Sequence, residues 1–155
     1  MEAALRVGLM VPANNTTMER ELVAWLPAGT SCMMLRIARG KGTLTLAEIP
    51  AYVARATSLA RAFAEEPVDI VIYGCTAAGI LAGPSRDAGI AASLSRITGK
   101  PAVTTASAMV DALHHAGARE VALVTALPGP RERAADGISS GGRHASYLLL
   151  PVIPA

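Results

Sequence analysis

The sequence has 155 residues, of which 52% are hydrophobic and 17% charged, with a formal net charge of +2. A chain of this length is expected to form one domain with a substantial core. Its small net charge, without a basic stripe, argues against nucleic acid as a partner. No apolar run approaches the roughly 20 residues of a membrane span, and the N-terminus lacks the pattern of a signal peptide. We therefore expect a soluble, cytoplasmic protein with no membrane partner.

The first part of the chain predicts two pairs of a strand and a helix. The apolar run Arg6 to Pro12 is typical of a buried parallel strand, and the capping-box pattern Thr16-x-x-Glu19 predicts a helix after it. Residues 31–38 predict a second strand. A second capping-box pattern, Thr45-x-x-Glu48, predicts the start of a helix with an apolar stripe along one side.

The middle of the chain continues this alternation. Val68 to Tyr73 is β-branched and almost continuously apolar, which is typical of a strand inside a covered sheet. Gly74-Cys75-Thr76 is expected to open a loop. The next expected elements are a helix at Ser85 to Thr98, a strand at Pro101 to Thr104, a helix at Ala106 to Ala116 capped by Thr105, and a strand at Glu120 to Thr125.

This alternating order predicts an α/β fold with a doubly wound parallel sheet in three layers, flavodoxin- or Rossmann-like. Residues 1–127 are expected to form this α/β lobe. Residues 128–155 hold four prolines and four glycines and show no sustained period, so we expect an irregular tail there.

Two polar segments are expected to meet at one edge of this sheet. Ligands of open parallel sheets bind at the carboxyl ends of the strands, where loops lead into helices. Asn14 and Thr16 follow the first strand, and Gly74, Cys75 and Thr76 follow the third. Amides, hydroxyls and one thiol around a small cavity favour a small carboxylic acid as the ligand.

Each of these residues also has a purely structural interpretation. Cysteine is often a small buried hydrophobic residue, but a thiol just beyond a strand end, between Gly74 and Thr76, lies where loop N–H groups favour a reactive thiolate. Asn14 and Thr16 could serve only in a turn or a helix cap. Cys32 lies in the middle of a predicted strand and is interpreted as a core residue.

The sequence argues against a nucleotide or a metal at this site. Gly74-x4-Gly79 is followed by Ile80-Leu81 instead of the lysine and hydroxyl residue of a phosphate loop, and no G-x-G-x-x-G follows the first strand. His114 and His115 are adjacent in a helix, so their side chains diverge. We therefore expect no cofactor.

Three segments carry a resemblance to a known family: VGLMVPANNTTMERE, VDIVIYGCTAAGILAGPSRDA and ITGKPAVTTASAMVDALHHAGAREVALVTA. Between Arg6 and Ala126 the chain resembles the first half of maleate cis-trans isomerases, a branch of the aspartate/glutamate racemase superfamily. The resemblance implies the first lobe of a two-lobe fold that needs no metal or organic cofactor. It also implies that Cys75 is a catalytic cysteine, that Asn14 binds a substrate carboxylate and that Thr76 helps to hold the acid.

The resemblance leaves three chemistries open. In an isomerase, the Cys75 thiolate would attack the double bond of a cis-butenedioate. The carbon–carbon bond would become single and rotate, and elimination of the thiolate would give the trans isomer. In an amino-acid racemase, Cys75 would abstract an α-proton and a second cysteine would return it. The related arylmalonate decarboxylases carry a hydroxyl residue in place of Cys75, which favours isomerase or racemase chemistry here.

Two departures from the family pattern affect these expectations. The family places a tyrosine soon after the last predicted strand, whereas this chain reads Thr125-Ala126-Leu127. The second half of the family, with its own cysteine, has no counterpart in the sequence, so a truncated or frame-shifted product is expected. A small-acid binding domain without turnover, or an inactive half-domain, is the alternative to an enzyme. Apolar surface left bare by a missing lobe predicts a homo-oligomer.

Overall fold

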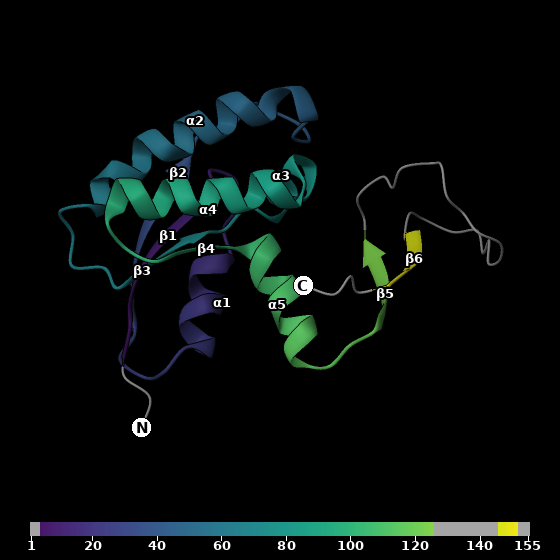
Figure 1. The fold of residues 1–155 in the computed structure, drawn as a ribbon. Helices are drawn as coiled ribbons and strands as arrows, with labels where there is room; N and C mark the ends of the chain where they lie inside the picture. Colours follow the sequence, from purple (N-terminus) through teal and green to yellow (C-terminus); the bar gives the residue numbers. More distant parts are fainter. Residues whose placement is uncertain (1–3, 126–145, 152–155) are drawn as a thin grey trace. The chain divides into compact units, whose positions relative to one another are not determined.

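The computed structural model describes residues 4–125 and 146–151, and these divide into two compact units, residues 1–109 and 110–155. Figure 1 shows the order of the elements along the chain. The strands are β1 (Arg6–Pro12), β2 (Ser31–Ile37), β3 (Ile70–Tyr73), β4 (Ala102–Thr104), β5 (Glu120–Thr125) and β6 (Ser146–Pro151). The α-helices are α1 (Met18–Trp25), α2 (Ile49–Ala60), α3 (Thr76–Ala82), α4 (Pro84–Thr98) and α5 (Thr105–His115). Single 3-10 turns, Leu46–Glu48 and Arg61–Phe63, flank α2.

The first unit contains a four-stranded parallel sheet in the order β2-β1-β3-β4. The chain passes from β1 outward to β2 and then returns to place β3 on the other side of β1. The winding direction therefore reverses between β1 and β3. The carboxyl ends of these two strands form the switch point at which doubly wound sheets bind ligands. The predicted α/β class with a doubly wound parallel sheet is confirmed.

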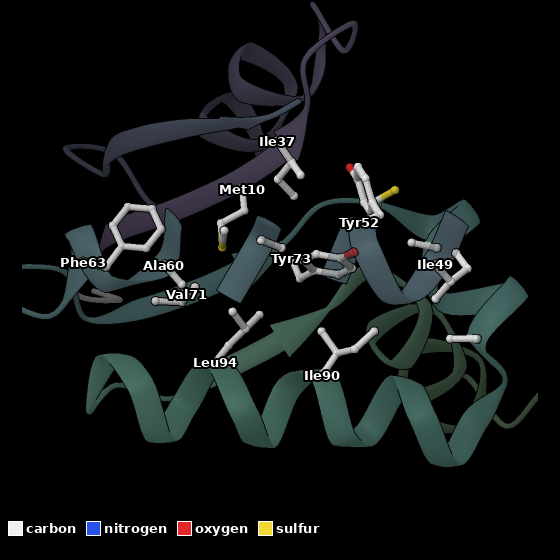
Figure 2. Close-up of a cluster of buried hydrophobic side chains, with 14 of the residues drawn as sticks. Met10, Ile37, Ile49, Tyr52, Ala60, Phe63, Val71, Tyr73, Ile90 and Leu94 are labelled. Carbon is white, nitrogen blue, oxygen red and sulfur yellow. The ribbon is translucent and has the colours of Figure 1, made fainter. Parts of the chain in front are cut away.

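Helices cover both faces of this sheet. On one face α2 and α4 bury the larger core, and Figure 2 shows Ile90 and Leu94 pointing from α4 toward Val71 and Tyr73 of β3. On the other face a smaller cluster centred on β1 packs against Met18 and other residues of α1. The near-continuous apolar character of β1 and β3 follows from this double coverage.

Two details of the helices differ from the sequence prediction. The capping box expected at Thr16 is wrong, because Thr17 is the N-cap of α1. Asn15 instead accepts hydrogen bonds through its Oδ1 from the backbone N–H groups of Thr17 (3.1 Å) and Met18 (3.0 Å). The expected loop after Cys75 is also wrong, because residues 76–82 form helix α3. By contrast, the Thr45 capping box is confirmed, with the Thr45 N–H donating to Glu48 at 2.8 Å.

The second unit contains a different pairing from the one predicted. β5 was expected to extend the parallel sheet, but it pairs with β6 in a two-stranded antiparallel sheet, with Leu123 opposite Leu148. The expectation of an irregular tail is thus wrong for residues 146–151, where the apolar run SYLLLP has the composition of a strand and an antiparallel partner in β5. Residues 128–145 and 152–155 of the expected tail lie outside the described residues. None of the helices described here is long and apolar enough to cross a membrane.

Candidate active site

The two predicted polar segments follow the two strands of the switch point. β1 and β3 are in register with Met10 opposite Tyr73, and the N–H of Gly74 donates to the Met10 carbonyl at 2.7 Å. The loop after β1 is held by the Ala13 N–H, which donates to the Ile37 carbonyl of β2 at 2.9 Å. Both loops therefore leave the same edge of the sheet, as the sequence predicted.

Gly74 fixes how closely α1 approaches the end of β3. A Cβ at this position would lie 2.6 Å from the sulfur of Met18 and 3.0 Å from the Met10 carbonyl oxygen. Only glycine leaves room for these neighbours without a shift. The structure thus gives Gly74, predicted as a substrate-binding residue, a packing role, and its N–H is already used by Met10.

Cys75 connects β3 to α3 and lies almost completely inside the protein. Its backbone carbonyl accepts from the N–H groups of Ala78 (3.1 Å) and Gly79 (3.2 Å), so that it serves as the N-cap of α3. The residue is 5% exposed and belongs to the larger core cluster. Burial alone would fit a purely structural role as a small apolar side chain. The groups next to Cys75 therefore distinguish a structural role from a reactive one.

Two buried tyrosine hydroxyls without partners interact with the charge of this cysteine. Among the described residues, the buried side-chain atoms without a hydrogen-bond partner are the hydroxyls of Tyr52 and Tyr73 and one carboxylate oxygen of Asp87. Both tyrosines are completely buried. Burial is the main cause that raises the pKa of each phenol above its usual range, and the charge of Cys75 acts in the same direction on both. A core selected only for stability would not leave such groups unpaired in one place.

Asp87 extends this polar cluster beneath α3. Its other carboxylate oxygen accepts a hydrogen bond from the buried Thr104 hydroxyl of β4, which also lies 3.0 Å from the hydroxyl of Ser107. The carboxylate can approach only because position 79 is a glycine, where a Cβ would lie 2.5 Å from Asp87 Oδ1. The charge of Asp87 contributes to the raised pKa of Tyr73. The polar cluster therefore involves α2, β3, α4 and β4.

The remaining predicted residues are exposed at the same sheet edge. Thr76 donates through its hydroxyl to Thr105 Oγ1 at 3.0 Å, which in turn donates to the Tyr73 carbonyl at 3.4 Å. Asn14 and Thr16 are exposed, and within the described part of the chain their side chains form no hydrogen bond. The structure thus keeps the Asn14 amide available for a ligand.

Some residues of the site were missed by sequence reasoning. Arg36 donates to the carbonyl of Asn15 at 2.6 Å and to that of Ala13 at 3.3 Å, which fixes the loop that carries Asn14. Tyr52 lies three residues after Ile49 on the apolar side of α2. A tyrosine among the aliphatic residues on this side of the helix could have indicated a buried hydroxyl group. Asp87 gave a similar signal as a carboxylate on the buried side of α4.

Cys32 differs from Cys75 in every respect that matters for reactivity. It lies on β2 opposite Val7, at the amino-terminal end of the strands, and is partly buried beside the cluster of β1. Burial, together with the negative charge of Glu19, raises the pKa of its thiol. The prediction that Cys32 packs in the core holds in part, since it is only half-buried.

Two surface hollows lie on other parts of the described residues. One surface hollow lies along the outer side of α1, next to Trp25, and another lies at the amino-terminal end of β1, next to Arg6. Neither includes a polar residue of the cluster around Cys75. Within residues 4–125 and 146–151, no group of three or more histidine, cysteine or acidic side chains is arranged to hold a metal ion.

A doubly wound sheet with a buried thiol and unpaired hydroxyls at its switch point defines an α/β domain with a candidate cysteine-based site. The family profile of arylmalonate decarboxylase matches residues 7–133, and the chain belongs to this family. It is 28% identical over 134 residues to the maleate isomerase of Pseudomonas putida, which covers 80% of this chain and 54% of that protein. The chain thus spans about half the length of the curated relatives it matches.

Solved structures agree with this assignment. The maleate isomerase Iso from Pseudomonas putida S16 matches 76% of this chain and 51% of its own, with a TM-score of 0.63 and 25% identity. A mutant maleate cis-trans isomerase of Nocardia farcinica, with a covalently bound succinylcysteine intermediate, matches 72% of this chain and 49% of its own, with a TM-score of 0.61 and 23% identity. The latter supports the fold alone.

Proposed function

We propose that this chain acts in a cofactor-independent cis-trans isomerase, with Cys75 as the nucleophile and a small dicarboxylic acid such as maleate as the substrate. The observation that carries the proposal is the position of Cys75 at the switch point, with two unpartnered tyrosine hydroxyls beside it. A buried thiol surrounded by donors is suited to covalent chemistry that forms and releases a thiolate.

The proposed reaction needs no net proton transfer. The Cys75 thiolate forms a carbon–sulfur bond with one alkene carbon, and the π electron pair moves toward the carboxylate of the other carbon. The central bond is then single and rotates. Return of the electron pair expels the thiolate and restores the double bond in the trans geometry. Dispersal of charge onto a carboxylate requires donors to that carboxylate.

Asn14 is proposed as such a donor, with Thr16 beside it, and Thr76 would join them when its hydroxyl turns from Thr105 to the carboxylate. All three side chains are exposed at the sheet edge, and the Asn14 amide is not used by the described residues. A charge-assisted hydrogen bond contributes about 1.5–3 kcal/mol. Asn14→Ala should therefore weaken maleate binding by about tenfold or more, measured by isothermal calorimetry, while Asn15 keeps its hydrogen bonds at the start of α1.

The relatives support an isomerase. The names of the matched Pseudomonas putida proteins give maleate isomerase as their activity. Because the chain spans about half of these relatives, turnover by the chain itself is part of the proposal.

Racemase chemistry with two opposed thiols finds less support within these residues. The sequence has two cysteines, and Cys32 pairs with Val7 at the amino-terminal end of the sheet, whereas Cys75 follows its carboxyl end. Strand β1 lies between β2, which carries Cys32, and β3, which precedes Cys75. The two cysteines therefore lie at opposite ends of the sheet. No second thiol of this chain is placed to return a proton.

The test follows the vinyl protons of maleate and fumarate by NMR. The unmodified chain and Cys32→Ala should convert maleate to fumarate, and Cys75→Ala should lose this conversion. Shifts of the Asn14 and Thr76 amide signals without conversion would favour the alternative of a small-acid binding domain. Absence of both conversion and amide shifts, or equal activity of Cys75→Ala, would refute the proposal.

A further inference from the structure

The Tyr52 hydroxyl supports the proposed function by its place beside Cys75, but none of the proposed reaction steps gives it a role of its own. Tyr52 lies on α2 with Ile49 and Ala56 on the same buried side of the helix, and none of its surface is exposed. Its hydroxyl has no hydrogen-bond partner among the described residues. Figure 2 shows it at the same end of the core as Tyr73 and Ile49, away from Phe63.

Cys75 and Tyr52 belong to the same core cluster. After burial, Cys75 is the next cause that raises the pKa of Tyr52, and its charge also raises the pKa of Tyr73. A neutral thiol is a weak acceptor, which fits the unpartnered state of the hydroxyl. A thiolate is a much stronger acceptor, because hydrogen bonds to charged groups are about twice as strong as neutral ones.

The surroundings keep Tyr52 protonated, and thus a donor. Burial is the largest cause that raises its pKa, and the positive charge of Arg39, from the loop after β2, opposes it only weakly as the last of the causes. The guanidinium of the exposed Arg55 lies over the Tyr52 ring, 5.8 Å from its centroid. The other charged group near this cluster, Asp87 of α4, acts on Tyr73.

We propose that Tyr52 is a positioning residue that donates a hydrogen bond to the Cys75 thiolate and so stabilises the nucleophile in a site from which water is largely excluded. This role rests on the proposed function of Cys75 as a nucleophile. It explains why a core helix carries a hydroxyl that would otherwise cost stability. The hydroxyl loses this acceptor when the thiolate attacks the substrate and regains it when the thiolate is expelled.

The experiment measures how thiolate formation at Cys75 depends on pH. Cys32→Ser leaves Cys75 as the single thiol, because the sequence has two cysteines. In this background, thiolate absorbance and the rate of alkylation by iodoacetamide are followed against pH. Adding Tyr52→Phe should raise the midpoint of both curves by about one pH unit or more. This shift corresponds to about a tenfold loss of thiolate at a pH below the midpoint. The alkylation rate on the high-pH plateau, which reports access, should stay the same.

Tyr73→Phe is the matched control, since it removes another buried, unpartnered hydroxyl near Cys75. Its effect on the midpoint should be clearly smaller than that of Tyr52→Phe. Site-specific 3-fluorotyrosine at position 52 is a stronger donor of nearly the same shape, so it should lower the midpoint. Because its shape is conserved, the fold should stay intact. A midpoint that is equal in the parent and Tyr52→Phe, or unmoved by fluorotyrosine, would overturn the proposal.

These measurements need no substrate, so they separate this inference from the proposed function. If the midpoint moves as expected but maleate is not converted, the hydrogen bond stands and the isomerase proposal fails. If maleate is converted but the midpoint does not move, the isomerase stands and the role of Tyr52 is wrong. In an active chain, Tyr52→Phe should lower the rate at neutral pH and recover most of it at higher pH.

Discussion

The packing beneath the candidate site can be tested with one methyl group at Gly79. In Gly79→Ala the new Cβ would lie 2.5 Å from Asp87 Oδ1 and 2.6 Å from the Cβ of Ala106. Neither neighbour can swing aside, because Asp87 is buried and hydrogen-bonded to Thr104, and an alanine has no rotatable side chain. Helix α3 or its neighbours must therefore shift, and α3 begins at Cys75.

Two opposing effects set the size of the change. Alanine in place of glycine inside a helix stabilises it by about 0.5–1 kcal/mol. Overpacking of a filled core costs about 1–3 kcal/mol, and displacement of the Asp87 carboxylate would also weaken a charged hydrogen bond of about 1.5–3 kcal/mol. The unfavourable effects are larger, so we expect Gly79→Ala to lower the free energy of unfolding by about 1–3 kcal/mol.

Gly89→Ala provides the matched control. Gly89 is also inside a helix, α4, but it is exposed and a Cβ there would meet nothing within 4 Å. Only the helix-forming preference remains, so this substitution should raise the free energy of unfolding by about 0.5–1 kcal/mol. Urea titrations followed by circular dichroism give the free energy of unfolding of each variant. The two values can be compared if the free energy falls with urea concentration at the same slope in both variants. If Gly79→Ala stabilises the protein as much as Gly89→Ala, the close packing of α3 against Asp87 is refuted.

Three further predictions concern the start of α1, a surface ion pair and assembly. Asn15→Ala should destabilise the protein by about 1 kcal/mol in the same titration, because the backbone N–H groups at the start of α1 lose their acceptor, and no change would contradict that role. Hydrogen bonds from Arg6 lower the pKa of Asp69 from 3.8 to about 2, so their stabilisation is complete above pH 4 and is lost as the pH falls toward 2; Asp69→Asn should remove this part of the acid dependence. The exposed apolar residues Ile80 and Leu81 on α3 support a homo-oligomer, which sedimentation should report and which Ile80→Glu should weaken; a monomer at all concentrations would contradict it.

The fold could be predicted from the sequence because its signals are local and agree with one another. β-branched apolar runs mark β1 and β3, a capping box marks the turn that opens α2, and Gly99 with a positive φ of 68° ends α4 where the sequence placed the end. The pairing of β5 could not be predicted in this way. A strand carries no record of its partner in its own sequence, and the run Ser146–Pro151 was too short to be distinguished from a tail.

The candidate site was predicted only as far as its loops. Asn14, Gly74, Cys75 and Thr76 follow strands, and topology alone brings the ends of parallel strands to one edge. Tyr52 lies on a helix remote in sequence, and its contact with Cys75 depends on how α2 packs on the sheet. Residues that reach a site only through the packing of a remote helix cannot be predicted from a local sequence pattern.

The distribution of unsatisfied polar atoms links the packing of this domain to its proposed chemistry. Among the residues with described side chains, the buried oxygens without a partner are on Tyr52, Tyr73 and Asp87. Each such atom lowers stability by about 1–3 kcal/mol, and an isolated phenol hydroxyl would be removed by substitution to phenylalanine at little structural cost. The two tyrosine hydroxyls interact with one buried cysteine and can donate to negative charge at its sulfur, whereas the Asp87 carboxylate can only accept. The donors are in place before the charge forms, so the transition state needs little reorganisation.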